Sequence, residues 1–279
     1  MKKLLVIITI SASLVFGAYE IEEAPSIIEV TQKIKTKEQL EATVINLAGK
    51  QRMLTQKMVK EALFVLKGIK GKECRANLLL SIEQFDKTLK GLLNGDEQLG
   101  LQKTKDEKIF KQLMKVSNLW VSFKDSLKKG DIDVINNQNI PLLENMDKVV
   151  QMYQDNVDSS LDPSIAKTID TAGKQRMLTQ KMTKELLLAA NGVEVNNNIE
   201  NAKNTFYLFK RTLSQLKSST KDDAVKKQLN LIDTIMHEYE TIIVNKDISD
   251  KMLREVQSLN MRLLKESNNA VKIYEATIK

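Results

Sequence analysis

The chain has 279 residues, a formal net charge of +7, 10 glycines, 3 prolines and 5% aromatic residues, which favours helices over a β-sheet. The positive charge is spread evenly and no aromatic-rich basic stripe is present, which argues against nucleic-acid binding. The single cysteine and the single histidine, Cys74 and His237, exclude an intrachain disulfide, a typical zinc site and a Cys-His dyad.

The N-terminus has the pattern of a secretory signal peptide. Two lysines precede an apolar run at Leu4–Phe16, and the small residues Gly17 and Ala18 follow it. The run is shorter than the roughly 20 residues that a membrane span needs. We therefore expect a signal peptide over residues 1–18 and export to the periplasm, with an uncleaved membrane anchor as the alternative.

Four helices are predicted over residues 36–160. The pairs Thr36–Gln39 and Thr104–Glu107 have the pattern of capping boxes, which mark the starts of the first and third helices. A glycine at position 68 or 71 can end the first helix in the left-handed conformation. The second helix is expected near 73–93, and the fourth follows the turn "KKGD".

Four more helices are predicted over residues 163–279. Asp162 followed by Pro163 is typical of a helix start. The helices are expected near 163–191, 196–218, 221–245 and 249–278. Short loops make successive helices antiparallel neighbours. We predict an all-α fold of two tandem antiparallel four-helix bundles; the alternative is that helices continue from one unit into the next.

The two units are copies of one repeat of about 120 residues. The word "AGKQRMLTQKM" occurs at Ala48–Met58 and again at Ala172–Met182, and 15 of 20 residues agree between 45–64 and 169–188. Over 77–93 and 201–217 only 5 of 17 residues agree. Some constraint has therefore acted on the first helix of each unit and not on the second.

On a helical wheel Arg52, Thr55 and Gln56 project from a face flanked by apolar residues, and the lysines at 50, 57 and 60 are expected to face solvent. Arg176 and its neighbours repeat this pattern. One interpretation is structural, with each arginine paired to a carboxylate or a helix end. However, packing explains one or two stripes of a helix, whereas the word is identical on every face.

Arginine is rare in this chain, since only six of the 43 Lys and Arg residues are arginine and two of those six occupy the matching positions. The planar guanidinium binds planar oxyanions with two parallel hydrogen bonds. Gly49 and Gly173, one turn earlier, allow two helices to approach closely. The pattern predicts a pocket for a small anion between two such helices.

The word resembles the signature of the sensor domain of type IV pili methyl-accepting chemotaxis transducers (PilJ type). It is also similar to the corresponding helix of nitrate/nitrite sensor kinases. The resemblance implies a periplasmic four-helix bundle that binds nitrate between two first helices. The residues that it implies as ligand-binding are Arg52, Arg176, Gly49, Gly173, Gln51, Gln175, Thr55, Thr179, Gln56 and Gln180.

The sequence differs from that pattern in carrying two sensor units, and we expect it to act without a C-terminal membrane helix, kinase or methyl-accepting segment of its own. We expect one chain to supply both halves of the site, or a homodimer to do so, and a membrane receptor or kinase to read the bound form. The leading hypothesis is a sensor for nitrate or nitrite. The alternative is a helical interaction module without a small ligand.

An enzyme is the least favoured class, and we expect no cofactor and no metal. The repeated word contains no carboxylate or histidine that could act as a base. Glu61 and Glu185 follow it, but they lie on the opposite side of the helix from the arginines.

Overall fold

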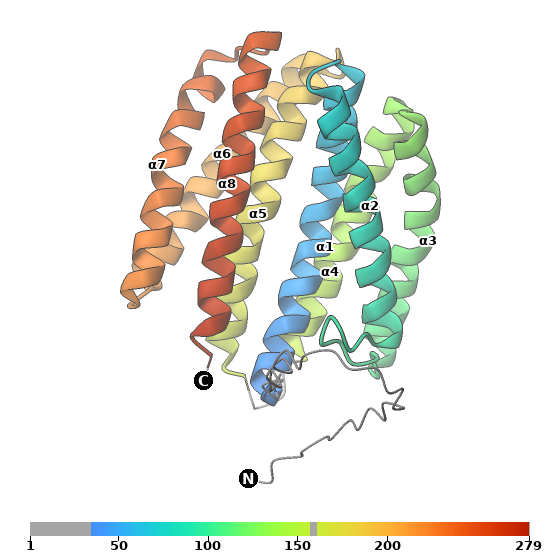
Figure 1. Cartoon of the computed structure of the whole chain (residues 1–279), viewed down its shortest axis with the longest axis vertical. Helices are drawn as coiled ribbons and strands as arrows, with labels where there is room; N and C mark the ends of the chain where they lie inside the picture. Colours follow the sequence, from blue (N-terminus) through green and yellow to red (C-terminus); the bar gives the residue numbers. More distant parts are fainter. Residues whose placement is uncertain (1–34, 157–160, 279) are drawn as a thin grey trace, which may run out of the picture. The chain divides into compact units, whose positions relative to one another are not determined.

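The computed structural model describes residues 35–156 and 161–278, so the predicted signal peptide lies outside the described residues. The described chain forms helices and no strands, as predicted (Figure 1). No helix among them combines the length and apolarity that a membrane span requires. The helices are α1 (Lys37–Leu66), α2 (Gly71–Asn94), α3 (Glu107–Lys129), α4 (Ile132–Asp155), α5 (Pro163–Ala190), α6 (Val195–Ser219), α7 (Asp223–Asn245) and α8 (Asp250–Ala276).

The helix starts follow local hydrogen bonding, with one correction. The capping box at Thr36 is confirmed, because the amide of Gln39 donates to its hydroxyl and the Gln39 side chain accepts from the Thr36 amide. The predicted box at Thr104 is wrong. Asp106 caps α3 instead by accepting from the amide of Ile109 at 2.9 Å, and the Thr104 hydroxyl bonds elsewhere. A carboxylate two residues closer to the helix is the better acceptor for the free amides.

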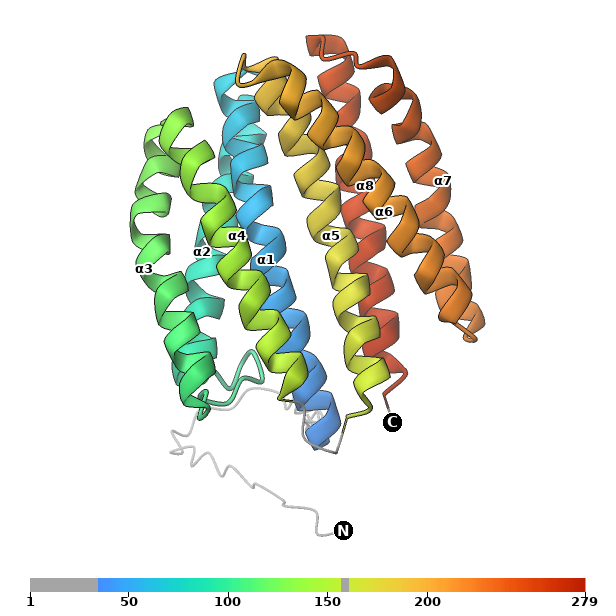
Figure 2. The same ribbon diagram turned by 180° about the vertical axis from the view of Figure 1, so that it is seen from behind.

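The two motif helices lie at the centre of the fold. Figures 1 and 2 show α1 and α5 side by side, with α2 and α4 packed on α1 and α6 and α8 packed on α5, while α3 and α7 lie on the outer sides of the two bundles. The interface between α1 and α5 is the most extensive one between any two helices of the described chain. Each unit is thus an antiparallel four-helix bundle, and the two bundles meet through their first helices.

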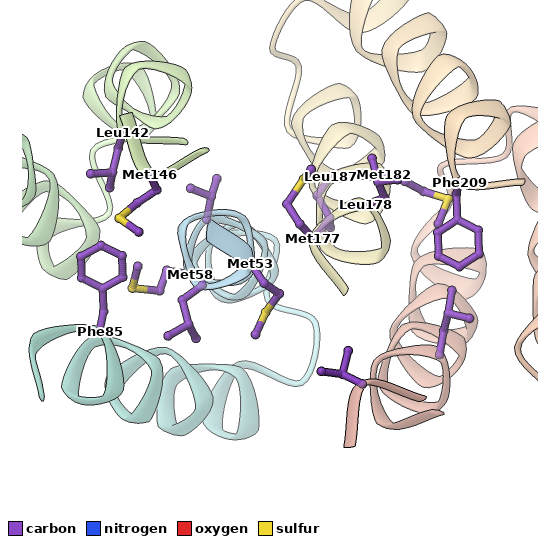
Figure 3. Packing of buried hydrophobic residues seen from close by; sticks show 14 of the residues in the cluster. Met53, Met58, Phe85, Leu142, Met146, Met177, Leu178, Met182, Leu187 and Phe209 are labelled. Atoms are coloured by element: carbon purple, nitrogen blue, oxygen red, sulfur yellow. The ribbon is translucent and has the colours of Figure 1, made fainter. Parts of the chain in front are cut away.

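One hydrophobic core runs through both bundles. Met58, Phe85 and Met146 meet between α1, α2 and α4, and Met182 lies beside Phe209 in the second bundle (Figure 3). Most buried hydrophobic residues of both repeats form one continuous cluster that crosses the α1–α5 interface, and a smaller separate cluster joins Ala42 and Ile45 of α1 to Ala166 and Ile169 of α5. The bundles are therefore joined by shared packing as well as by the chain connection.

The central helices have almost no solvent-facing side, which corrects the helical-wheel prediction for the lysines. Lys60 is only 1% exposed, and Lys57 reaches across to α2, where its ammonium donates to the Ser81 hydroxyl at 2.6 Å. Lys50 is half-buried, and burial together with the charge of Arg176 lowers its pKa. Because α1 is surrounded by α2, α4 and α5, a lysine on its remaining face is covered by the neighbouring helix.

One pair of equivalent core positions is apolar in the first bundle and polar in the second. In the second bundle the hydroxyls of Thr183 and Tyr239 are hydrogen-bonded to each other, and both side chains are buried. In the first bundle the same places hold Val59 and Phe123, also buried. Each bundle therefore satisfies its own core, because a buried hydroxyl needs a partner and an apolar pair needs none.

This difference predicts the outcome of a mutant cycle. Phe123→Tyr alone is expected to lower the free energy of unfolding by about 1–3 kcal/mol, because the new hydroxyl is buried and the position equivalent to Thr183 holds Val59, which has no polar group to bond it. Adding Val59→Thr supplies that partner, so the double variant is expected to recover part of the loss. Urea unfolding of the four proteins measures the coupling. Strictly additive losses would show that the two positions do not interact.

Candidate functional site

The two copies of the repeated word face each other across the α1–α5 interface, where their polar side chains form two layers. The arginine layer contains Arg52 of α1 and Arg176 of α5, with exposed fractions of 1% and 3%. The lysine layer, two turns further along each helix, contains Lys60 and Lys184. Burying a cation is costly unless it is paired, so the partners of these four groups define what the site can do.

Arg52 is neutralised by two carboxylates. Its Nη1 donates to Asp147 of α4 at 2.6 Å, and its Nη2 donates to Asp170 of α5 at 2.7 Å. Asp147 belongs to the same repeat, whereas Asp170 belongs to the other one. These short, charge-assisted bonds occupy both terminal nitrogens of the guanidinium.

Arg176 occupies the equivalent position in the second repeat but forms no ion pair with any described carboxylate. Its Nη1 lies 3.5 Å from the amide oxygen of Asn268 on α8, and its Nη2 lies 3.3 Å from the backbone oxygen of Asn46 on α1. Both hydrogen bonds are long and both acceptors are neutral. Burial and the nearby charge of Arg52 lower the pKa of Arg176 to about 10. Its positive charge is thus less well compensated than that of Arg52.

The two motif glycines make room for the second guanidinium. A Cβ added at Gly173 would lie 3.2 Å from Nη2 of Arg176, and one added at Gly49 would lie 3.6 Å from the same atom. Arg176 therefore lies against the backbone of both helices at their close approach. The glycines were predicted to allow this approach, and the structure places the guanidinium on them.

Several polar atoms of the arginine layer have no hydrogen-bond partner among the described residues. They are Nε of Arg52, Nε of Arg176 and Oδ1 of Asn46, all buried. Two of the three are N–H donors that carry part of a positive charge. Unpaired buried donors beside a poorly compensated guanidinium are what a small anion would require of a site.

The lysine layer joins the repeats in a crosswise manner. The Lys60 ammonium of α1 donates to Asn260 of α8 at 2.8 Å, and the Lys184 ammonium of α5 donates to Asn139 of α4 at 3.0 Å. Each asparagine oxygen also accepts from the motif glutamine of its own repeat, Gln180 or Gln56, at 3.1 Å. Lys60 has a carboxylate partner in addition, Glu61, at 3.0 Å.

The remaining predicted site residues take different places. Gln51 donates to the backbone oxygen of Phe85 on α2, and Gln175 donates to Thr212 on α6, so both amides are directed into their own bundles. The Thr55 hydroxyl donates to the backbone oxygen of Arg52. Thr179 likewise donates to a backbone oxygen of its own helix. None of these four side chains is hydrogen-bonded to a terminal nitrogen of either arginine.

Sequence reasoning missed the groups that complete both layers. Asp147, Asp170, Asn139 and Asn260 lie outside the repeated word, and Lys60 and Lys184 follow it by two residues. The lysines and the asparagines recur at matching positions of the two repeats, which is a signal that could have been read. The two aspartates have no such signal, because their counterparts are Asn268 and Asn46.

Comparison with protein families matches the chain to the Type IV pili methyl-accepting chemotaxis transducer N-terminal domain, PilJ, over residues 35–147 and 163–270. Each repeat is matched separately, so the predicted tandem arrangement is confirmed. Comparison with curated proteins gave no match, and comparison with solved structures gave none either.

Because Lys184 is buried, the free energy of unfolding is expected to increase with pH. Burial lowers the pKa of Lys184 from the ordinary 10.5 to about 8. Between these values the unfolded chain holds the proton and the folded chain does not, so the free energy of unfolding increases with pH. Below pH 8 both states are charged and the cost of burial is fully present.

Lys184→Met is expected to remove this increase, on the order of 1–3 kcal/mol, between pH 8 and pH 10. Urea unfolding at both pH values measures it. Lys111→Met, an exposed change on α3, serves as the control and should keep the wild-type slope. An unchanged slope in Lys184→Met would contradict the assignment.

Proposed function

Since the chain belongs to the family of N-terminal domains of type IV pili methyl-accepting chemotaxis transducers, we propose that it is a periplasmic sensor domain for a small oxyanion, nitrate or nitrite. The anion would bind between α1 and α5. A membrane chemoreceptor or a sensor kinase would read the liganded form. The arginine layer is the place where the proposal can be tested on named residues.

The observation that carries the proposal is the state of Arg176. Its guanidinium is buried, has long bonds to two neutral acceptors, and has an Nε without a partner among the described residues. A buried guanidinium with spare donors favours a planar oxyanion, because two oxygens can accept from it in parallel.

The surrounding charges favour a monovalent anion over a divalent one. Asp170 and Glu275 both act on the charge of Arg176. Glu275 is partly buried, and its pKa is raised chiefly by that burial. A second negative charge on the ligand would therefore meet carboxylates as well as the guanidinium. Sulfate is a suitable discriminating probe for this reason.

Ligand entry requires a local movement of the central helices. Arg176 is 3% exposed and lies against the glycines of α1 and α5. An anion at this guanidinium would have to replace its long bonds to Asn46 and Asn268. Binding would thus change the spacing between α1 and α5, which is a displacement that a partner protein can detect.

A second candidate function is an interaction module without a small ligand. The observation in its favour is Arg52, whose two carboxylate partners satisfy it inside the chain. In that case the arginine layer only holds the repeats together. Changes at Arg176 would then alter oligomer mass or co-purifying partners, and no anion would bind.

Nitrate binding is expected to be weak and dependent on Arg176. The best very small ligands gain about 1.5 kcal/mol per heavy atom, so four atoms give roughly 6 kcal/mol and a Kd in the tens of micromolar. Arg176→Ala is expected to raise the Kd by a factor of about 10 to 150, the equivalent of a lost charged hydrogen bond. Calorimetry measures both values.

Arg262→Ala, at an exposed arginine paired with Glu238, is the matched control and should bind as the wild type does. Sulfate should bind more weakly than nitrate. Absence of heat and of any thermal shift with millimolar nitrate and nitrite would refute the proposal.

The two motif glycines give a second test. Alanine in the middle of a helix stabilises by up to about 1 kcal/mol relative to glycine, so Gly49→Ala is expected to stabilise without affecting binding. Gly173→Ala brings a Cβ to 3.2 Å from the Arg176 guanidinium and is expected to weaken nitrate binding several-fold. Calorimetry and thermal unfolding of both variants separate the effects. Equal binding by the two variants would contradict the placement of the anion at Arg176.

A further inference from the structure

Equivalent positions in the two repeats supply different chemical groups to the motif arginines. Asp170 on α5 corresponds to Asn46 on α1, and both lie opposite the arginine of the other repeat. The Asp170 carboxylate accepts from Arg52 at 2.7 Å, whereas Asn46 offers Arg176 only its backbone oxygen, at 3.3 Å. The two repeats thus share a fold but differ in charge at this pair of positions.

A second position has changed in the same direction. Asp147 on α4 corresponds to Asn268 on α8. The carboxylate of Asp147 lies 2.6 Å from its arginine, and the amide oxygen of Asn268 lies 3.5 Å from the other one. Both differences give Arg52 a carboxylate as hydrogen-bond acceptor where Arg176 has a neutral acceptor.

We infer that Asp170 is a built-in ligand of Arg52: its carboxylate occupies the place of a free oxyanion at the first arginine, so the chain takes one external anion, at Arg176. This inference rests on the proposed anion binding only for its second half. The first half concerns a contact within the chain and can be tested without any external ligand.

The chemistry of the contact supports this role. A carboxylate is a planar anion with two equivalent oxygens, as nitrate is with three, and it meets a guanidinium through the same N–H groups. Asp170 reaches Arg52 from the facing helix of the other repeat, and its side chain is only 13% exposed. With Asp147 also in contact, a free anion at Arg52 would meet two like charges.

The asymmetry determines which helix lies beside an external anion. Asn268 and Glu275, the groups around Arg176 outside the central pair, both belong to α8. At Arg52 the equivalent position belongs to α4, where Asp147 is already paired. An anion at Arg176 would therefore lie beside α8 and not beside α4.

Removing the built-in ligand tests the first half. In the full chain, Asp170→Ala is expected to lower Tm by several degrees, because Arg52 loses a partly buried carboxylate. Sodium formate or sodium nitrate at 50–100 mM is then expected to restore at least half of the loss, relative to sodium chloride at equal ionic strength. Wild type and Asp125→Ala, which removes an exposed ion pair with Lys129, should show no comparable shift.

Asp170→Ser serves as the second variant if the alanine variant does not fold, since it also removes the carboxylate and leaves space for a small anion. Restoration by formate or nitrate in neither variant would overturn the inference. Restoration in the variant together with no nitrate binding by the wild type would uphold the built-in ligand and refute the proposed function.

Transferring the carboxylate tests the second half. Asn268→Asp gives Arg176 the partner that Arg52 has, and it is expected to weaken nitrate binding at least tenfold with Tm unchanged or raised. Asn230→Asp, the same chemical change at an exposed position of α7, should leave binding as in the wild type. Calorimetry of the wild type should give one nitrate per chain. Two nitrates per chain, or undiminished binding by Asn268→Asp, would overturn the inference.

Discussion

Four cations lie buried between α1 and α5, and each of them donates a hydrogen bond to a group from the opposite repeat. Arg52 reaches Asp170, Arg176 reaches the Asn46 backbone, and Lys60 and Lys184 cross to asparagines of α8 and α4. Removing a cation from water without such partners is strongly unfavourable. Neither repeat alone can provide them, so the close pairing of the central helices is a requirement for burying these residues, and the outer helices are arranged around that pair.

This requirement changes the meaning of the repeated word. The two copies of the word are identical on every face of the helix, which first indicated a constraint beyond packing. However, α1 is covered on nearly every face, so packing and hydrogen bonds between the repeats can explain why most of the word is the same in both copies. The outer helices are freer to change. In the first repeat Asp86 of α2 forms an ion pair with Lys124 of α3. At the equivalent positions of the second repeat the acid and the base are swapped, since Lys210 of α6 pairs with Glu240 of α7. The case for a ligand therefore depends on the incomplete compensation of Arg176 and not on the repetition.

The sequence allowed the fold to be predicted well, because helix periodicity, caps and the repeat all agree. The error at Thr104 arose because two possible caps lie within three residues, and the choice depends on which acceptor reaches the free amides. The candidate site was only half predictable. The arginines and glycines stand out through the repeat, whereas Asp147 and Asp170 become their neighbours only through the register of α4 and α5 against α1. That register is set by the packing of whole helices and cannot be read from local spacing.

The difference between Asn46 and Asp170 has a genetic consequence. In a homodimer one codon specifies both copies of a position, so any substitution that suits one side of the two-fold axis is imposed on the other. A tandem chain encodes the two sides separately, and each can be selected alone. A tandem chain can therefore carry a carboxylate at position 170 and an amide at position 46, whereas a homodimer would carry the same group on both sides.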